Sequence, residues 1–297
     1  MSNYLLEHPQ LKEKLDAFDG ELIIPSLPDI YLRLRELVDN PESSVSDVTT
    51  LLSQDPSLVI EVLKTVNSAA YGLRNPVVKV EQAVSLLGFD EVVNLVLANT
   101  VVNHLSQGVE GKKFNTKGFW EHSMGVAIFT KVILQHASKV NKEWHSEAYV
   151  CGLVHDVGKL ILYNSFQNEY IQALAQAELE QIAIIEAEEK VFGFNHQDIG
   201  ALVMDEWGFS RNTVKAVEMH DTLHYLDNVD DSFPFVSIIH IANILSKFLD
   251  FGHSGDKFIP RFYPDGYGVL GLTVENIWPM CVQAKKAFVQ LKASITF

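Results

Sequence analysis

Residues 152–163 read GLVHDVGKLILY, an apolar run that contains a histidine, an aspartate and a lysine. The spacing predicts one buried helix over residues 145–163, which places His155, Asp156 and Lys159 inside the core. Burying such groups costs several kcal/mol unless they satisfy one another or bind a ligand. Adjacent residues of a helix point about 100° apart, yet His155 and Asp156 can both reach one ion beside it. The stretch therefore predicts a polar site within a helical core.

Helix signals dominate the rest of the chain, and strand signals are almost absent. Ser44 or Ser46 can cap a helix over residues 45–52, and Asp55-Pro56 reads as the start of the next helix. Gly88 is expected to end a helix over 80–87, and Asp90 to begin one with an apolar stripe at Val93, Leu97, Val101 and Leu105. Further helices are expected near residues 119–138, 145–163, 166–178, 180–191, 196–207, 211–224, 234–250 and, capped by Thr273, up to 293. The pattern predicts an all-α fold.

The expected organisation has four parts. Residues 1–19 form an N-terminal extension, and residues 20–106 form an N-terminal helical unit. A polar, glycine-containing stretch over 106–118 marks the boundary to a helical core at 114–250. Residues 251–297 are expected to hold an irregular Gly- and Pro-rich segment up to 271 and then the last helix.

The composition restricts the function. The chain has 297 residues, with 23 basic and 38 acidic side chains and a net charge of −15. This charge repels nucleic acid and anionic membrane surfaces, so neither is expected as a partner. The start has no secretory signal, and no apolar run approaches the roughly 18 residues of a membrane span. Cys151 and Cys281 form no CxxC pair and read as reduced thiols, so we expect a cytoplasmic protein.

Several of the 11 histidines occupy positions typical of core residues. His122 shares a helix face with apolar residues, as do His196 and His220 on later predicted helices. A buried imidazole needs a carbonyl, a carboxylate or a metal as partner. Imidazole and carboxylate ligands suit Fe, Mn or Zn, and Lys159 lies one helical turn after His155, where it could meet a phosphate oxygen. Together these residues predict metal-assisted phosphoester hydrolysis, with Asp156 and Lys159 as catalytic residues.

The alternative is that each histidine is an ordinary hydrogen-bonded core residue, which is the commoner situation for one taken alone. Histidines that read as surface or incidental residues are His8, His104, His136, His145, His224 and His253.

The order His, His-Asp, His, His resembles the HD phosphohydrolase superfamily and its HD-GYP relatives, which are α-helical metalloenzymes. The N-terminal half is similar to the HDOD subfamily of bacterial regulatory modules, and the resemblance covers about residues 20–250. The segments that carry it are Leu27-Pro28, Asp55-Pro56-Ser57-Leu58, residues 66–72 (VNSAAYG), residues 80–88 (VEQAVSLLG) and residues 240–245 (HIANIL).

The resemblance implies a metal site for one or two divalent ions. Its implied ligands are His122, His155, Asp156, His196, His220 and Asn243. Asn243 stands where the superfamily has an aspartate, so the site loses one anionic ligand and should bind a divalent ion less tightly. An Asn243→Asp substitution is therefore expected to tighten metal binding, unless Asp198 or Asp221 already supplies a carboxylate. The glycine-tyrosine-proline segment of HD-GYP proteins is missing after His220, and Tyr263–Gly268 is interpreted as unrelated loop chemistry.

Three functions follow from these observations. The preferred one is a bacterial HDOD-type signalling module with a degenerate HD metal site, acting by binding an unidentified signalling protein or a small phosphate-containing ligand. The second is a metal-dependent phosphohydrolase or phosphodiesterase with an impaired site. The third is a structural helical protein whose histidines satisfy each other. All three assume that side chains from distant helices converge on one polar site.

Overall fold

The fold is all-α, as the sequence predicts. The computed structural model describes residues 3–26, 29–40, 42–67, 73, 75–89, 92, 96, 114–141, 144–226, 230–255 and 258–294, and no strand occurs within these ranges. The N-terminal helices are α1 (Asn3–Glu7), α2 (Pro9–Ala17), α3 (Asp29–Asp39), α4 (Val45–Leu52), α5 (Pro56–Val66) and α6 (Val80–Leu87). The later ones are α8 (Thr116–His136), α9 (Trp144–Val154), α10 (Val157–Ser165), α11 (Gln167–Glu180), α12 (Ile184–Phe192), α13 (His196–Glu206), α14 (Arg211–Met219), the 3-10 helix η1 (Leu223–Tyr225), α15 (Phe233–Phe248), α16 (Pro264–Val269) and α17 (Val274–Ser294).

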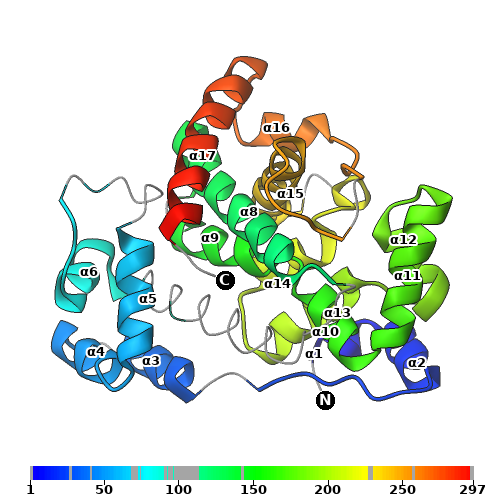
Figure 1. Ribbon diagram of the computed structural model, residues 1–297, viewed down its shortest axis with the longest axis horizontal. Coiled ribbons are helices and arrows are strands. Elements are labelled where there is room, and N and C mark those ends of the chain that lie inside the picture. Colours follow the sequence, from blue (N-terminus) through cyan, green and yellow to red (C-terminus); the bar gives the residue numbers. More distant parts are fainter. Residues whose placement is uncertain are drawn as a thin grey trace.

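The N-terminal helical unit, α3 to α6, forms a separate group at the left of Figure 1. Helices α4 and α6 have the predicted bounds and α5 begins at Pro56 as predicted, whereas α3 was not predicted from the sequence. The Ser44 side chain caps α4 in a reciprocal pair with Asp47, and the Asp55 carboxylate accepts a hydrogen bond from the backbone N–H of Leu58 at 3.2 Å. Gly88 ends α6 with a φ of 86°. Of the helix expected from Asp90 through Leu105, the structure describes only Val92 and Val96, which are both buried.

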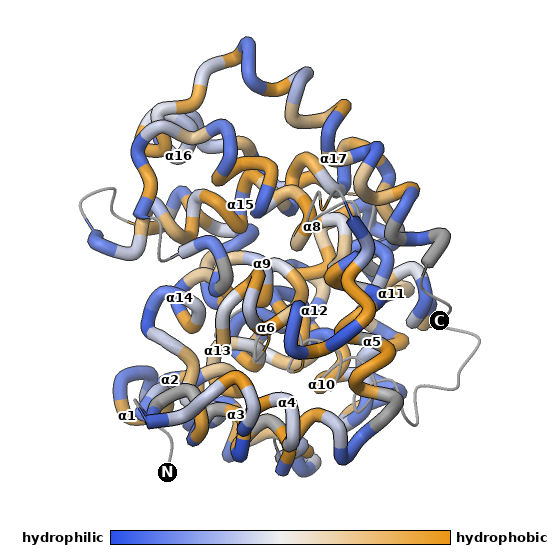
Figure 2. Tube along the Cα trace, turned by 90° about the vertical axis from the view of Figure 1, so that its left-hand side faces the viewer, coloured by the Kyte–Doolittle hydropathy of each residue, from blue (hydrophilic) through white to orange (hydrophobic). Residues whose placement is uncertain are grey.

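The core is organised around α8, which packs against α9, α15 and α17. Every residue of α8 from Gly118 to Thr130 is buried. A helix that is buried on all sides needs neighbours on every face, and α9, α15 and α17 pack against α8. Figure 2 shows that hydrophobic residues are spread over many helices, α5, α9 and α15 among them. His122, in the middle of this buried stretch, therefore has no access to bulk water.

The N-terminal extension is attached to this core at several points. Helix α1 packs against α13, and the backbone N–H of Tyr4 donates to the Asp205 carboxylate at 3.0 Å. Further along, the Trp207 indole N–H donates to the Pro25 carbonyl at 3.0 Å. The Phe18 ring packs against the rings of Phe166, Phe192 and Phe194 at centroid distances of 4.9, 5.4 and 5.6 Å. In Figure 1 the extension reaches the opposite side of the molecule from α3 to α6, and an extended segment joins the two.

The prediction of a single helix over 145–163 is wrong. Helix α9 ends at Val154, His155 and Asp156 form a turn, and α10 begins at Val157. The apolar spacing continues through the turn because both helices are buried, so periodicity alone does not reveal the break. The break frees His155 and Asp156 from helical geometry, which lets both side chains face the same site.

Two other boundaries differ from expectation. The helix expected over 211–224 ends at Met219, so His220 follows the helix instead of lying within it. The segment 251–271, expected to be irregular, contains the short helix α16, in which Gly266 and Tyr267 are buried. Pro264 can start this helix because its missing N–H would have no intrahelical partner there.

Gly158, in the first turn of α10, allows α10 and α13 to pack closely. A Cβ atom at Gly158 would overlap the carbonyl oxygen of His196. A side chain here would therefore push α10, which directly follows Asp156, away from α13, which begins with His196.

We predict that Gly158→Ala lowers the free energy of unfolding by about 2–3 kcal/mol, because the added methyl group overpacks a backbone contact. Gly268→Ala is the matched control, since nothing lies within 4 Å of a Cβ at Gly268. Urea unfolding measures both variants. Equal stability of the two would show that α10 and α13 do not need this close approach.

Candidate metal centre

Four imidazole rings converge on the carboxylate of Asp156. They come from the middle of α8, from the turn between α9 and α10, from the first residue of α13 and from the residue after α14. The distances from the ring Nε2 atoms to the nearer Asp156 oxygen are 3.9 Å for His122, 3.4 Å for His155, 3.5 Å for His196 and 3.3 Å for His220. The expected convergence is therefore present, and each of these five side chains is at most 1% exposed.

Hydrogen bonds behind the rings fix their orientation. The Nδ1 atoms of His155 and His220 lie 2.8 and 2.9 Å from the carbonyl oxygens of Gly152 and Val217. Because a carbonyl only accepts, these Nδ1 atoms carry the proton and the Nε2 atoms present lone pairs. His196 follows the same rule, since its Nδ1 lies 2.5 Å from the Glu188 carboxylate. A carboxylate or carbonyl behind the ring is the usual arrangement for metal-binding histidines.

The inward-facing atoms lack hydrogen-bond partners. Among the described residues, the Nε2 atoms of all four rings and one oxygen of Asp156 take part in no hydrogen bond. Lone pairs and a carboxylate that face one another in a dry core repel each other unless a cation lies between them. Two ligand atoms each about 2.1 Å from an ion lie about 3.0–3.5 Å apart, which matches most of these distances. The donor set therefore fits a divalent transition metal.

The ligand atoms fall into two groups that share Asp156. His122, His155 and Asp156 form one group, and Asp156, His196 and His220 form the other, with the ligand atoms of each group within 4.8 Å of one another. The two oxygens of Asp156 face different groups. Each group would hold one ion, and Asp156 is the residue that the two groups have in common.

Lys159 distinguishes the two groups. Its buried ammonium donates to Asp156 Oδ2 and to the carbonyl of Ser254, both at 2.9 Å. Asp156 Oδ2 is the oxygen that faces His122 and His155, so the lysine places a positive charge beside that group. The sequence predicts that Lys159 contacts a phosphate, whereas its ammonium is paired with Asp156 in the structure. Its catalytic role remains a prediction.

Asn243 is linked to the group of Asp156, His196 and His220 by its hydrogen bond to the Asp221 carboxylate. Its amide nitrogen donates to Asp221 Oδ1 at 2.8 Å, and its amide oxygen is buried without a hydrogen bond among the described residues. The other oxygen of Asp221 lies 3.7 Å from the Nε2 of His196 and 3.8 Å from that of His220. Asp221 therefore brings a second carboxylate to this group, whereas Asp198 caps α13 and bonds the backbone of Asn195.

Two contributors to the site, Glu188 and Ser246, were not predicted from the sequence. Glu188, fully buried on α12, accepts hydrogen bonds from both the backbone N–H and the ring of His196. The sequence contains one indication of this role, because Glu188 lies one helical turn after Ile184 on the apolar face of the helix. Ser246 lies 3.4 Å from His122 Nδ1 and carries no comparable signal.

The electrostatics of the site favour neutral His122 and His220 and a charged Asp156. Burial, with the adjacent His155 adding to it, lowers the pKa of His122 well below 6.5. Burial also lowers the pKa of His220 and of His240, whose ring bonds the His220 carbonyl. Burial alone would raise the pKa of Asp156, but His155 and Lys159 hold it well below its usual range. These are the protonation states that a metal ion requires of its ligands.

The sequence model of the HDOD domain matches residues 24–223, about two thirds of the chain. The chain belongs to the HDOD family. The matched part of this HDOD protein contains His122, His155, Asp156, His196 and His220, whereas Asn243 lies beyond it.

Solved structures share the fold. An HDOD domain protein of unknown function from Geobacter sulfurreducens has a TM-score of 0.74 at 23% identity, covering 98% of this chain and 96% of the other. A candidate phosphohydrolase from Shewanella amazonensis gives 0.68 at 23% identity, covering 98% of each chain. A candidate signal transduction protein from Marinobacter aquaeolei gives 0.75 at 21% identity, covering 98% of this chain and 65% of the other.

An uncharacterized protein of Treponema pallidum is 25% identical over 240 residues, which are 80% of this chain. This HDOD chain spans 45% of the length of that relative. Among the helices that the structure describes, none combines the length and apolar character needed to cross a bilayer.

We predict that the metal-free protein loses stability as the pH falls below about 6.5. The unfolded chain binds protons on His122, His220 and His240 at a pH where the folded chain does not, because their folded pKa values are lowered. The stability that these histidines contribute is fully present above their unfolded-state pKa. As the pH falls below that value, each histidine lowers the free energy of unfolding by up to about 1.4 kcal/mol per pH unit.

Urea unfolding between pH 8 and pH 5 measures this slope. His122→Gln should flatten it, whereas His145→Gln, on an exposed residue, should leave it unchanged. The same slope in both variants would contradict the lowered pKa of His122.

Proposed function

We propose that this HDOD protein is a signalling module that holds a divalent transition metal in a closed His–Asp centre and acts by binding, without turnover. The burial of the centre carries this proposal. The implied ligands are at most 1% exposed, and one oxygen of Asp156 is already paired with Lys159. A phosphoester would have to reach Asp156 through packed helices and compete with a buried ion pair. An unidentified signalling protein, or a small phosphate-containing ligand bound elsewhere on the molecule, is the proposed partner.

The first ion is expected in the group formed by Asp156, His196 and His220. This group also has the Asp221 carboxylate nearby, so two negative charges balance a divalent ion there. The group formed by His122, His155 and Asp156 instead lies beside the Lys159 ammonium, which repels a cation. Occupancy should therefore be sequential, with one tight and one weak ion.

We predict that the purified protein binds Mn²⁺, Fe²⁺ or Zn²⁺ and that His220→Ala abolishes the tight site, whereas His122→Ala spares it. Glu188→Gln should weaken the tight site about 10- to 100-fold, because it removes the charge that orients His196. Plasma mass spectrometry gives the metal content, and a competition titration with a chelator gives the affinity. Protein that binds no transition metal at all would support the structural interpretation of the histidines and overturn the proposal.

Asn243→Asp is a second variant for the same titration. It replaces an amide donor to Asp221 with a third carboxylate, so the metal-free protein should be less stable and metal binding tighter. Asn243→Ala is the control, since it removes the hydrogen bond without adding charge. Equal metal affinity in both variants would show that residue 243 does not influence the ion.

One observation favours the phosphohydrolase alternative. Asp221 replaces part of the charge that Asn243 fails to supply, so two carboxylates and four imidazoles lie within reach of the centre. When bound, a metal of this kind supplies a hydroxide near neutral pH.

Hydrolysis assays on manganese-loaded protein separate the two functions. With bis(p-nitrophenyl) phosphate and p-nitrophenyl phosphate, we expect no turnover above that of Mn²⁺ in buffer and no difference between the wild type and Asp156→Ala. Turnover that Asp156→Ala and Asp221→Asn both abolish would establish the enzyme in place of the binding module.

A further inference from the structure

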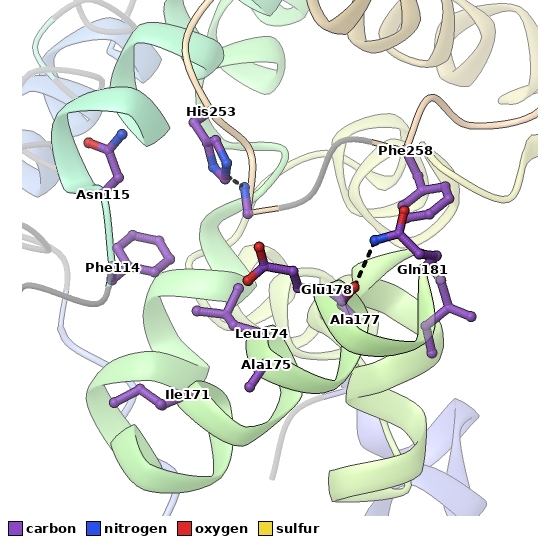
Figure 3. Close-up of a pocket in the computed structure, with 12 residues that line it drawn as sticks. Phe114, Asn115, Ile171, Leu174, Ala175, Ala177, Glu178, Gln181, His253 and Phe258 are labelled. Carbon is purple, nitrogen blue, oxygen red and sulfur yellow. Dashed lines mark hydrogen bonds between the residues drawn. The ribbon is translucent and has the colours of Figure 1, made fainter.

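A cavity of about 770 Å³ lies between the start of α8, helix α11 and the residues His253, Gly255 and Phe258, away from the His–Asp centre (Figure 3). Its walls are mainly apolar, and the larger apolar side chains are Phe114, Ile171, Leu174 and Phe258. A volume of this size and an apolar lining are typical of sites for small organic ligands. The cavity is thus suited to a ligand with a hydrophobic ring system.

Two polar groups at the cavity define the ligand further. The backbone N–H of Gly255 donates to His253 Nδ1 at 3.1 Å, so the proton of this imidazole is on Nε2, which is a donor. The Glu178 carboxylate points from α11 toward the same space in Figure 3, and it is an acceptor. The Asn115 side chain is engaged in capping α8, where its oxygen accepts from the N–H of Gly118 at 2.9 Å.

The Glu178 carboxylate disfavours anionic ligands at this cavity. Of the described residues that line the cavity, one is acidic and none is lysine or arginine. A phosphate or carboxylate group would lie near Glu178 in a protein of net charge −15. The ligand class that fits is a neutral or cationic aromatic heterocycle.

The wall that carries His253 also contacts the His–Asp centre. Ser254, between the lining residues His253 and Gly255, accepts a hydrogen bond through its carbonyl from Lys159, which donates in turn to Asp156. The segment is also held against α8: the N–H of His253 donates to the Gly118 carbonyl at 2.7 Å. At Gly252 the φ is +72°, and a Cβ atom would overlap the Gly118 carbonyl oxygen and the backbone nitrogen of His122. Movement of this wall therefore changes the surroundings of both Lys159 and His122.

We propose that this cavity binds a small neutral or cationic aromatic heterocycle and that residues 252–255 couple its occupancy to the His–Asp centre through Lys159. The proposal of a ligand site depends only on the cavity. The proposal of coupling also depends on the metal centre of the proposed function. A ligand that moves the Ser254 carbonyl changes how strongly Lys159 neutralises Asp156, and hence the affinity for a cation. By linkage, the metal must change the affinity for the ligand by the same factor.

The ligand site is tested on metal-free full-length protein with three probes that share one ring system. They are indole, tryptamine and indole-3-acetate, which are neutral, cationic and anionic, and ligand-observed NMR or calorimetry gives their dissociation constants. Tryptamine is expected to bind most tightly and indole-3-acetate most weakly, by about 10-fold or more. Absence of binding, or preference for the anion, would overturn the ligand class.

Two variants locate the binding. Ala175→Trp fills the cavity from an exposed position on α11 and should weaken tryptamine at least 10-fold. Glu178→Gln should weaken tryptamine but not indole, by about 3- to 10-fold. Glu186→Gln, an exposed residue of α12 outside the cavity lining, makes the same change in net charge and should alter neither. Binding that survives Ala175→Trp would place the probe elsewhere and overturn the site.

The coupling is tested by titrating tryptamine with and without saturating Mn²⁺, and Mn²⁺ with and without tryptamine. We expect both affinities to change by one common factor of about 3 or more. Equal tryptamine affinity in metal-free and manganese-loaded protein would refute the coupling. If the protein binds no Mn²⁺, the proposed function fails, and the ligand site is still decided by the metal-free measurements.

Discussion

A single buried carboxylate organises the core. Asp156 is fully removed from water, and four imidazole rings direct lone pairs toward it. Such a charge is tolerated in a protein interior only when positive charge lies close to it. Lys159 supplies one positive charge, and a bound cation is the natural source of another. The paths of α8, α10, α13 and α14 all serve to bring these groups together.

The centre is assembled mainly at the ends of helices. His155 and Asp156 form the turn between two helices, His196 is the first residue of α13, and His220 directly follows α14. At a helix end the backbone is no longer committed to helical geometry, so neighbouring side chains can point into one site. Of the six implied ligands, only His122 and Asn243 lie within continuous helices.

This construction explains what the sequence could and could not predict. The existence and type of most helices followed from apolar spacing and from caps such as Ser44 and Asp55. The convergence of the four histidines followed from family resemblance and from their positions on apolar faces. The break at His155 could not be seen, because both flanking helices are buried and the apolar pattern runs through it. The contact between Glu188 and His196 joins two separate helices. It depends on how these helices pack, which cannot be predicted from the residue pattern of a single sequence.

The attachment of the N-terminal extension bears on where this domain can be cut. The HDOD match begins at residue 24, yet the Phe18 ring fills a space among three phenylalanines of the core, and α1 packs against the helix that begins with His196. A fragment trimmed to the family boundary would expose that aromatic cluster to water and leave one side of α13 bare. The minimal folding unit therefore starts earlier than the recognisable motif, and fragments for expression should keep residues 3–23.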